Sequence, residues 1–274
     1  MTRQLSKRLQ QLALGFLAAL LLAGFWSTAG MAQTRAPALA YVRVGQFIPN
    51  ESLTVQFQLA GQGSASQQTN GQNPMPVSDL GYEQISDYQP LPAGRYTLTV
   101  RSQETVLLCS TYGLGAGDRY TLTLYGIVPT SPTTNPQTLM ARLQNIVGGV
   151  DAHGANGHLP QMTLLHDKVS SQTNAPQVRL MHLAPGLVPL DLTVQSPSQT
   201  LFTQTLAYPM TSEVQSIEGG DTDLAMAVHE GKVAITQQLL ALKSQTLTDI
   251  FVVGGLAAPQ PVKIIVADPT SSQS

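Results

Sequence analysis

Apolar and polar residues alternate along several short segments of the chain. A period of two places one set of side chains on each face of a β-strand, so each segment predicts a strand with one buried and one solvent-facing side. The segments are Thr54–Leu59, Tyr96–Val100, Tyr120–Leu124, Leu190–Val194 and Leu224–Val228. Turn sequences lie between them, among them the LPAG ending at Gly94 and the EGGD that contains Gly220. This spacing favours antiparallel β-sandwiches.

The two halves of the chain repeat this pattern. Val42 and Arg43 match Val178 and Arg179 at an offset of 136 residues. The segment from Ser86 matches that from Ser212 at an offset of 126, and two extra residues after Gly220 change the offset to 128. Because matching positions recur in the same order, the sequence predicts two sandwich domains in tandem.

Segment 231–245 is ambiguous, because Leu239, Leu240 and several good helix formers would also suit a short helix. Its counterpart in the first half, QETVLLCSTYGLGAG, is rich in Thr, Val and Gly and has the composition of a strand. We therefore expect a strand in both halves.

The repeat sets the expected domain limits. The segments QMTLLHDK and QPVKIIVADP are similar and are expected to be the closing strands of the two domains. The first domain then covers residues 38–169, with a long insertion at 128–160 that begins with a Pro- and Thr-rich loop. The second covers residues 176–268, and the tail 269–274 is expected to be disordered.

The first 32 residues have the order of a secretory signal peptide: three basic residues, an apolar run of about fifteen and a small-x-small site ending at Ala32. The alternative is an uncleaved membrane anchor, but the apolar run is shorter than the roughly twenty residues that span a bilayer. We expect cleavage after Ala32, no membrane insertion of the mature chain, and a periplasmic or extracellular location.

Cleavage would remove three of 14 basic residues and leave 11 against 16 acidic ones, a net charge of −5. A mildly acidic surface does not attract phosphate backbones, so nucleic acid is not an expected partner. Cys109 is the single cysteine and cannot form an internal disulfide. Its alternation with Leu107 predicts a small buried side chain and not a reactive thiol.

The stretch VRLMHLAPG, followed by the alternating strand LDLTV, resembles the opening of a bacterial exported family catalogued as domain of unknown function 4397. LPAGRYTLTV and GAGDRYTLTLYG are similar to later strands of that family. The resemblance implies two tandem copies, each an immunoglobulin-like sandwich, on a secreted or surface protein without established catalytic activity. The first copy departs from the pattern at Gln46, which stands where the second copy has His182.

A second resemblance is to the AlgF family of periplasmic accessory proteins for alginate O-acetylation. Those proteins also have a signal peptide, an A-x-V-R-V opening and a second β domain containing VR. This resemblance implies the alternative function of an accessory factor for exopolysaccharide modification.

His182 follows Val178 and Leu180 at a spacing of two, so it is expected on the inward face at the end of a strand. Its counterpart Gln46 can exchange hydrogen bonds but cannot act as a general base. A structural role in fixing a loop explains both residues, with Asp191 as a potential partner of His182. Arg179, Pro185, Gly94 and Gly220 are likewise assigned to the structural motif.

The candidate metal ligands are Asp151, His153 and His158, because imidazole and carboxylate suit transition metals and the intervening glycines let a loop wrap. Their spacing matches no compact metal motif, so a polar loop is the favoured interpretation. His166, Asp167 and Ser170 supply the residue types of a hydrolase triad, but neighbours on a strand point to opposite faces. We predict no catalytic residue and no cofactor.

These observations predict a non-enzymatic exported protein of two sandwiches that acts as an interaction module of the cell envelope or extracellular matrix. Gln- and Thr-rich faces suit a protein or polysaccharide partner. The absence of Trp from the mature chain counts against stacking on sugar rings. The sequence leaves the partner and the oligomeric state open.

Overall fold

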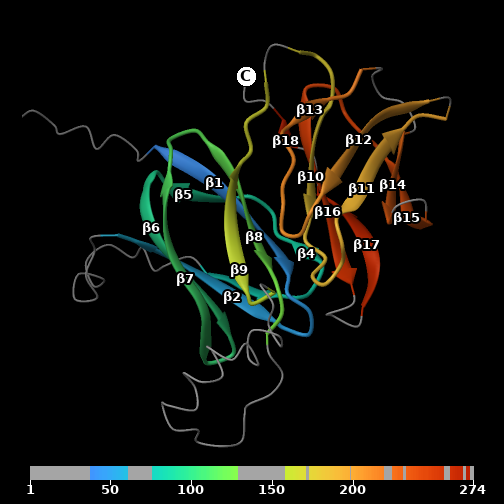
Figure 1. Ribbon diagram of the computed structural model, residues 1–274. Helices are drawn as coiled ribbons and strands as arrows, with labels where there is room; N and C mark the ends of the chain where they lie inside the picture. The colour runs from blue at the N-terminus through green and yellow to red at the C-terminus, as the bar shows by residue number, and fades with distance from the viewer. Residues whose placement is uncertain are drawn as a thin grey trace, which may run out of the picture. The chain divides into compact units, whose positions relative to one another are not determined.

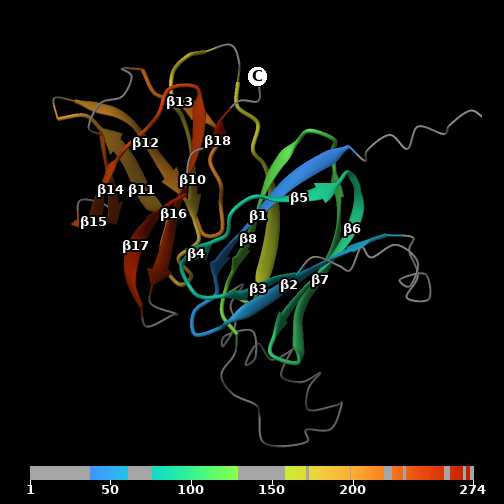
Figure 2. The same ribbon diagram turned by 180° about the vertical axis from the view of Figure 1, so that it is seen from behind.

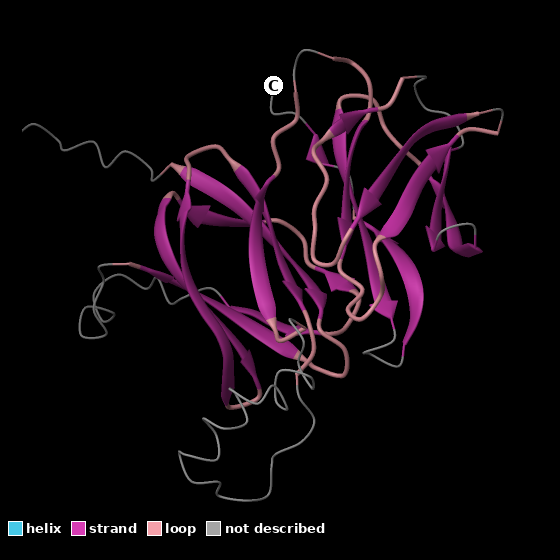
Figure 3. Cartoon of the chain, viewed as in Figure 1, coloured by secondary structure: helices cyan, strands magenta, loops and turns pink. Residues whose placement is uncertain are grey.

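The computed structural model describes residues 38–60, 76–128, 158–170, 173–197, 199–218, 224–230, 233–255, 260–267 and 270–271. Strands and loops make up all of this part of the chain, as Figure 3 shows. The strands form four sheets, which pair into two β-sandwich bodies, so the all-β prediction is confirmed. Within these ranges no helix is long and apolar enough to cross a membrane. The expected signal peptide, residues 1–32, lies outside the described residues.

The first sandwich contains strands β1 to β9 (Figure 1). One sheet has the order β4-β1-β8-β9, with β5 also paired to β1, and the other has the order β3-β2-β6-β7. The bounds are β1 Leu39–Phe47, β2 Leu53–Leu59, β3 Pro76–Leu80, β4 Gln84–Ile85, β5 Gln89–Pro92, β6 Gly94–Ser102, β7 Thr105–Leu114, β8 Arg119–Tyr125 and β9 Gln161–His166.

The second sandwich contains strands β10 to β18 and repeats this arrangement, as the two opposite views in Figures 1 and 2 allow the reader to follow. Its sheets have the orders β13-β10-β16-β17, with β18 also paired to β16, and β12-β11-β14-β15. The bounds are β10 Gln177–His182, β11 Leu190–Gln195, β12 Thr200–Leu206, β13 Gln215–Ser216, β14 Leu224–Glu230, β15 Val233–Leu240, β16 Thr246–Gly255, β17 Gln260–Val266 and β18 Thr270–Ser271.

Each sandwich has its own apolar core, built from alternate residues of the two sheets that face each other. In the first sandwich the core includes Val42, Val55, Leu98 and Leu122, all essentially inaccessible to solvent. The corresponding strands of the second supply Val178, Leu192, Met226 and Ile250. The period-two pattern therefore identified the inward faces of these strands correctly.

The repeat extends to individual hydrogen bonds. The Val44 amide donates to Ser86 Oγ at 2.9 Å, and the Ser86 amide donates to the Val44 carbonyl at 2.9 Å. In the second sandwich the Leu180 amide donates to Ser212 Oγ at 2.9 Å, and the Ser212 amide returns a bond of 2.8 Å to the Leu180 carbonyl. Both pairs lie at the offsets found in the sequence, so matching residues hold matching places.

The expectation of purely antiparallel pairing is wrong at one position in each sandwich. β1 runs parallel to β8, and β10 runs parallel to β16, over most of their lengths. A parallel pair needs a long crossover, and here the whole opposite sheet lies between the two strands in sequence. The opening strand of each sandwich can therefore lie beside the later strand, β8 or β16, in the same direction.

Two local predictions have opposite outcomes. The ambiguous segment 231–245 contains β15, so its assignment as a strand is confirmed. The expected disorder of 269–274 is wrong at Thr270 and Ser271, which pair with Thr246 and Leu247 of β16. Thr270 is buried and bonds the first sandwich, so its order comes from tertiary contacts that a local polar sequence does not reveal.

Gly94 does not have the role expected of a turn glycine, because it begins β6 with a φ outside the left-handed region. A Cβ built on Gly94 would lie 2.8 Å from Leu59 Cδ1, the end of a flexible side chain that can move aside, so neither the backbone conformation nor the space requires glycine there. Gly220 lies outside the described residues.

Candidate functional site

Four central strands of the two sandwiches are buried on both faces. All residues of β10 and β16 are buried, as are nearly all residues of β1 and β8. Their inward faces form the two cores, and their outward faces meet one another between the sandwiches. Residues Ala38–Ser274 accordingly form one compact unit.

A cluster of buried charges lies at the centre of this interface. Arg43 and Thr121 are opposite each other on β1 and β8, and Arg179 and Asp249 occupy the matching positions on β10 and β16. Arg43 Nη2 donates to Asp249 Oδ2 at 3.0 Å, which joins the two sandwiches directly. Arg179, on the same sheet as Asp249, donates two hydrogen bonds to this carboxylate, from Nε at 2.8 Å and from Nη2 at 2.9 Å.

Asp167, just after β9, completes the cluster. It forms an ion pair with Arg179 Nη2 and accepts bonds from Thr121 Oγ1 at 2.6 Å and from the Tyr88 hydroxyl at 2.8 Å. Burial by itself lowers the pKa of Arg179, but the carboxylates of Asp249 and Asp167 raise it by more, so the guanidinium stays charged. Two arginines thus face two aspartates, and the cluster is neutral as a whole. We call these four residues, with Thr121, the interface ion cluster.

An apolar seam continues the interface beside the interface ion cluster. The rings of Phe47 on β1 and Phe251 on β16 lie 4.6 Å apart between centroids, and both side chains are fully buried. Tyr125, Met181 and Val253 pack in the same group. Buried polar and apolar parts therefore hold the two sandwiches together side by side.

Sequence reasoning found only part of this interface. Arg179 was singled out as a motif residue, but Arg43, Asp167 and Asp249 were not assigned any contact. A signal was present: the nominally wet faces of β8 and β16 carry Tyr125, Phe251 and Val253. Large apolar residues at outward positions indicate that another layer covers the sheet.

His182 ends β10 with its side chain fully buried. The Ala184 amide donates to Nδ1 at 3.3 Å, and Nε2 lies 3.4 Å from the Val188 carbonyl, to which it donates. Gln46 makes the same pattern in the first sandwich: the Ile48 amide donates to Oε1 at 2.5 Å, and Nε2 donates to the Glu51 carbonyl at 3.0 Å. Both side chains span the loop that follows their strand.

Pro185 lies within the loop that His182 spans, and Gly186 follows it with φ of 83°. Asn50 takes the matching place in the first sandwich with φ of 60°. A left-handed residue after proline is typical of a type II turn, and glycine and asparagine adopt it most readily. Both ring nitrogens of His182 are thus committed to holding this turn.

Replacement of His182 by Gln is expected to preserve the loop and to remove a pH dependence. Burial lowers the pKa of His182 to about 4, and the hydrogen bond to Val188 offsets only part of this effect. Between pH 6.5 and about 4 the unfolded chain binds a proton that the native chain excludes. As the pH is lowered from 6.5 to about 4, the free energy of unfolding therefore falls by roughly 3 kcal/mol through this residue. Urea unfolding from pH 7.5 to 4 should show a shallower decline for H182Q, with His229→Gln as the control that keeps the steeper one.

The other candidate residues do not assemble into a reactive group. Asp191 accepts a bond from the Thr205 hydroxyl on an outer face and not from His182. His166 pairs with Asp118 at 3.3 Å, while the adjacent Asp167 belongs to the interface ion cluster, so the two side chains point to opposite faces.

Cys109 is exposed on β7, and the prediction that it is buried is wrong. It lies on the outward face of an edge strand, where alternation with a half-buried Leu107 does not imply burial.

Asp151 and His153, two of the three candidate metal ligands, lie outside the described residues. His158 is described: its ring packs edge-on against Tyr208 at 5.1 Å. The Ile127 amide donates to the His158 carbonyl at 2.6 Å, so the two ends of the 128–160 insertion lie together. The described ranges contain no group of three His, Cys, Asp or Glu side chains suited to a metal ion.

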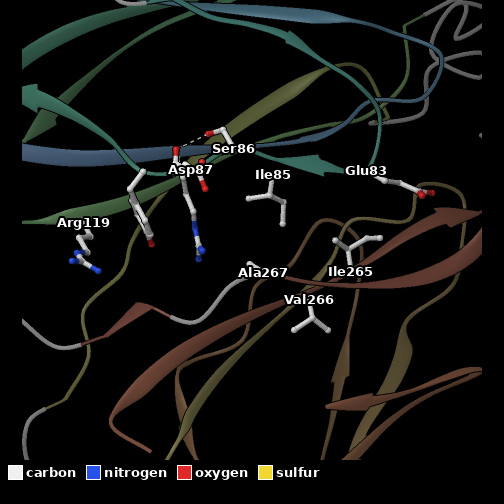
Figure 4. Close-up of a pocket in the computed structure, with 10 residues that line it drawn as sticks. Glu83, Ile85, Ser86, Asp87, Arg119, Ile265, Val266 and Ala267 are labelled. Carbon is white, nitrogen blue, oxygen red and sulfur yellow. Dashed lines mark hydrogen bonds between the residues drawn. The ribbon is translucent and has the colours of Figure 1, made fainter. Parts of the chain in front are cut away.

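A pocket of about 290 Å³ opens where the loop from β4 to β5 faces β17 of the second sandwich. Ile85 lies on one side and Ile265 and Ala267 on the other, whereas the Val266 side chain points away toward the core of the second sandwich (Figure 4). Arg119 lies at one end and Glu83 at the other. Glu83 bonds Lys263 at 2.9 Å, across the two sandwiches.

The two sheets away from the interface carry rows of neutral polar side chains among their outward residues. Thr97 and Thr111 are paired on the first, and Thr193 and Thr203 on the second, with hydroxyl oxygens 3.5 and 2.9 Å apart. Exposed Gln58 and Gln237 extend the two rows. We call these surfaces the outer faces. Hydroxyls and amides of this kind can exchange hydrogen bonds with a partner at little desolvation cost compared with charges.

Three solved structures align with most of the chain at low similarity. A candidate cell adhesion protein from Bacteroides ovatus aligns at 10% identity and a TM-score of 0.27, over 88% of this chain and 99% of that one. One from Bacteroides eggerthii gives 8% and 0.24, over 86% and 96%. A family 26 carbohydrate-binding module from Eubacterium rectale, in complex with maltoheptaose, gives 8% and 0.23, over 84% and 98%. With TM-scores below 0.5, we infer nothing about function from them.

The comparison with curated proteins gave no match. One protein family model does match the chain, over residues 40–145, and its description is "Domain of unknown function (DUF4397)". The match includes β1 to β8, from the strand that carries Arg43 to the strand that carries Thr121. The chain therefore contains one DUF4397 domain, at residues 40–145.

Proposed function

We propose that the chain is a non-enzymatic interaction module of the cell envelope or extracellular matrix, exported by its N-terminal signal peptide. The observation that carries this proposal is the pair of outer faces, which present rows of Thr and Gln side chains on a unit whose inner faces are joined. Sheets held in one unit lose little conformational entropy when a partner binds. The engagement of both His182 nitrogens in a turn supports the non-enzymatic part.

The proposal includes a second domain of the same family, at residues 176–268, after a first domain at 38–169. The shared strand order and the matching Ser86 and Ser212 bonds support a second copy. We further propose that both copies are immunoglobulin-like. Duplication gives the molecule two related outer faces, and two weak sites on one chain bind an extended partner more tightly than either site alone.

The test is retention of envelope components on the immobilised chain from residue 33 onward, offered as separate protein and polysaccharide fractions. Wild type is expected to retain a component from one of them. Thr111→Lys with Gln58→Lys, or Thr203→Lys with Gln237→Lys, should each reduce retention about tenfold by adding bulk and charge to one outer face. Gln199→Lys, at an exposed turn, is the matched control. Full retention by all outer-face variants would contradict the proposal.

Expression of the full-length chain tests export, since protein recovered from the periplasm or medium should begin at Gln33. Binding of an acetyltransferase subunit, with loss of polysaccharide acetylation in a deletion strain, would instead favour an accessory role in exopolysaccharide modification.

A further inference from the structure

The pocket beside the interface ion cluster has features of a ligand site that the outer faces do not explain. Its volume of about 290 Å³ is just below the usual range for small-molecule pockets, so it suits only a small ligand. Residues of both sandwiches line it, so it exists only when the two are joined. Most of its lining side chains are charged or carry a hydroxyl, and Ile85, Ile265 and Ala267 supply a smaller apolar part, so the pocket suits a ligand with both a charged and an apolar group.

Arg119 supplies the charge at one end. Its guanidinium lies 5.4 Å from the Tyr88 ring centroid and 5.8 Å from that of Tyr41, and its Nε is buried without a hydrogen-bond partner in the described part of the chain. Arg43 lies over the Tyr88 ring as well, at 4.8 Å. The Tyr88 hydroxyl is fixed by Asp167 and Thr270. Arg119 therefore lies against two aromatic rings, of which Tyr88 is itself anchored, and no carboxylate in the described part of the chain forms an ion pair with it.

The other charged residues that line the pocket are either in ion pairs or exposed to solvent. Arg43 is paired with Asp249, and Glu83 with Lys263. Asp87 is exposed, so water solvates its carboxylate, although its negative charge opposes an anion nearby. Among the described lining residues, the guanidinium of Arg119 is thus the cation that an incoming ligand could pair with.

We propose that this pocket binds a small monocarboxylate with an aliphatic body. The carboxylate would accept hydrogen bonds from the terminal nitrogens of Arg119, since guanidinium and carboxylate match in geometry and charge. The aliphatic part would lie between Ile85 and Ile265, beside Ala267. Such a ligand bridges the two sandwiches, so its binding would favour the joined state.

The test is an NMR titration of the chain from residue 33 onward with hexanoate, hexanol and glucuronate. Hexanoate is expected to shift resonances of Ile85 and Ile265 and to saturate, with a dissociation constant on the order of 1 mM for so small a ligand. Hexanol lacks the charge and glucuronate lacks the apolar body, so both should bind at least tenfold more weakly.

Matched variants separate this site from general surface binding. Arg119→Gln should weaken the binding of hexanoate at least tenfold. Arg119→Lys keeps the charge but loses the paired nitrogens of the guanidinium, so its affinity should lie between those of wild type and R119Q. Asp87→Asn should tighten the binding of hexanoate two- to fourfold, because it removes a negative charge that repels the carboxylate. Arg95→Gln, at an exposed arginine of the first outer face, should change nothing. Equal binding of hexanol, unchanged binding by R119Q, weaker binding by D87N, or no saturable shift at 20 mM ligand would each overturn the proposal.

Discussion

Replacement of Asp249 by Asn is expected to destabilise the protein by about 3–5 kcal/mol. The Asp249 carboxylate is fully buried and holds Arg43 of the first sandwich and Arg179 of the second. Asparagine keeps the volume but removes the charge, which leaves two buried guanidinium groups to share Asp167. Removal of one partner of a buried ion pair is costly because the remaining charge is left without compensation. In a unit of this size, the melting temperature should fall by about 10 °C.

The matched control is Asp191→Asn, which changes a half-exposed carboxylate on an outer face and is expected to cost less than 1 kcal/mol. If D249N fails to accumulate, Thr121→Val removes a buried hydroxyl from the same cluster at a smaller cost of about 1–3 kcal/mol. Equal unfolding midpoints for D249N and D191N would show that the interface ion cluster does not contribute to stability.

Replacement of Phe251 by Ala is expected to cost about 3–5 kcal/mol, because a fully buried aromatic side chain is lost from the apolar seam and leaves a cavity. Phe251 points outward from the core of its own sandwich and packs on Phe47 of the other. The loss should therefore weaken the joining of the sandwiches more than either core.

Chemical unfolding followed by circular dichroism measures this change, with Leu239→Ala as the control, since Leu239 is 75% exposed. If F251A costs as little as L239A, the seam is not a closely packed interface. If Phe47→Ala has an effect similar to that of F251A and the double variant costs less than the sum, the two rings are coupled.

The sequence was sufficient for the fold class, the repeat and the inward faces. Period-two alternation marked Val55, Leu98 and Leu122 correctly, because each such residue reports its own strand's environment. The offset of 128 placed Thr121 on Asp249, and these two residues take matching positions in their sheets. Internal comparison supplied what a single segment could not.

The interface was not predictable in the same way. Alternation assigns Arg43 and Arg179 to an outward face, and it cannot show that a second sheet covers that face. Thr121 and Asp249, two partners of Arg43, are 78 and 206 residues away from it, so no local pattern connects them. Asp167 was considered only beside His166, whereas its contacts are with Thr121, Tyr88 and Arg179. Contacts between domains depend on how the domains dock, and sequence spacing carries little of that information.

The two repeats are expected to fold as one cooperative unit through their joined inner faces. Differential scanning calorimetry of the chain from residue 33 onward tests it directly. We expect a single transition with equal calorimetric and van't Hoff enthalpies, since neither sandwich should unfold without exposing the interface of the other. A calorimetric enthalpy about twice the van't Hoff value, or two resolved transitions, would show that the sandwiches unfold independently and would contradict the account.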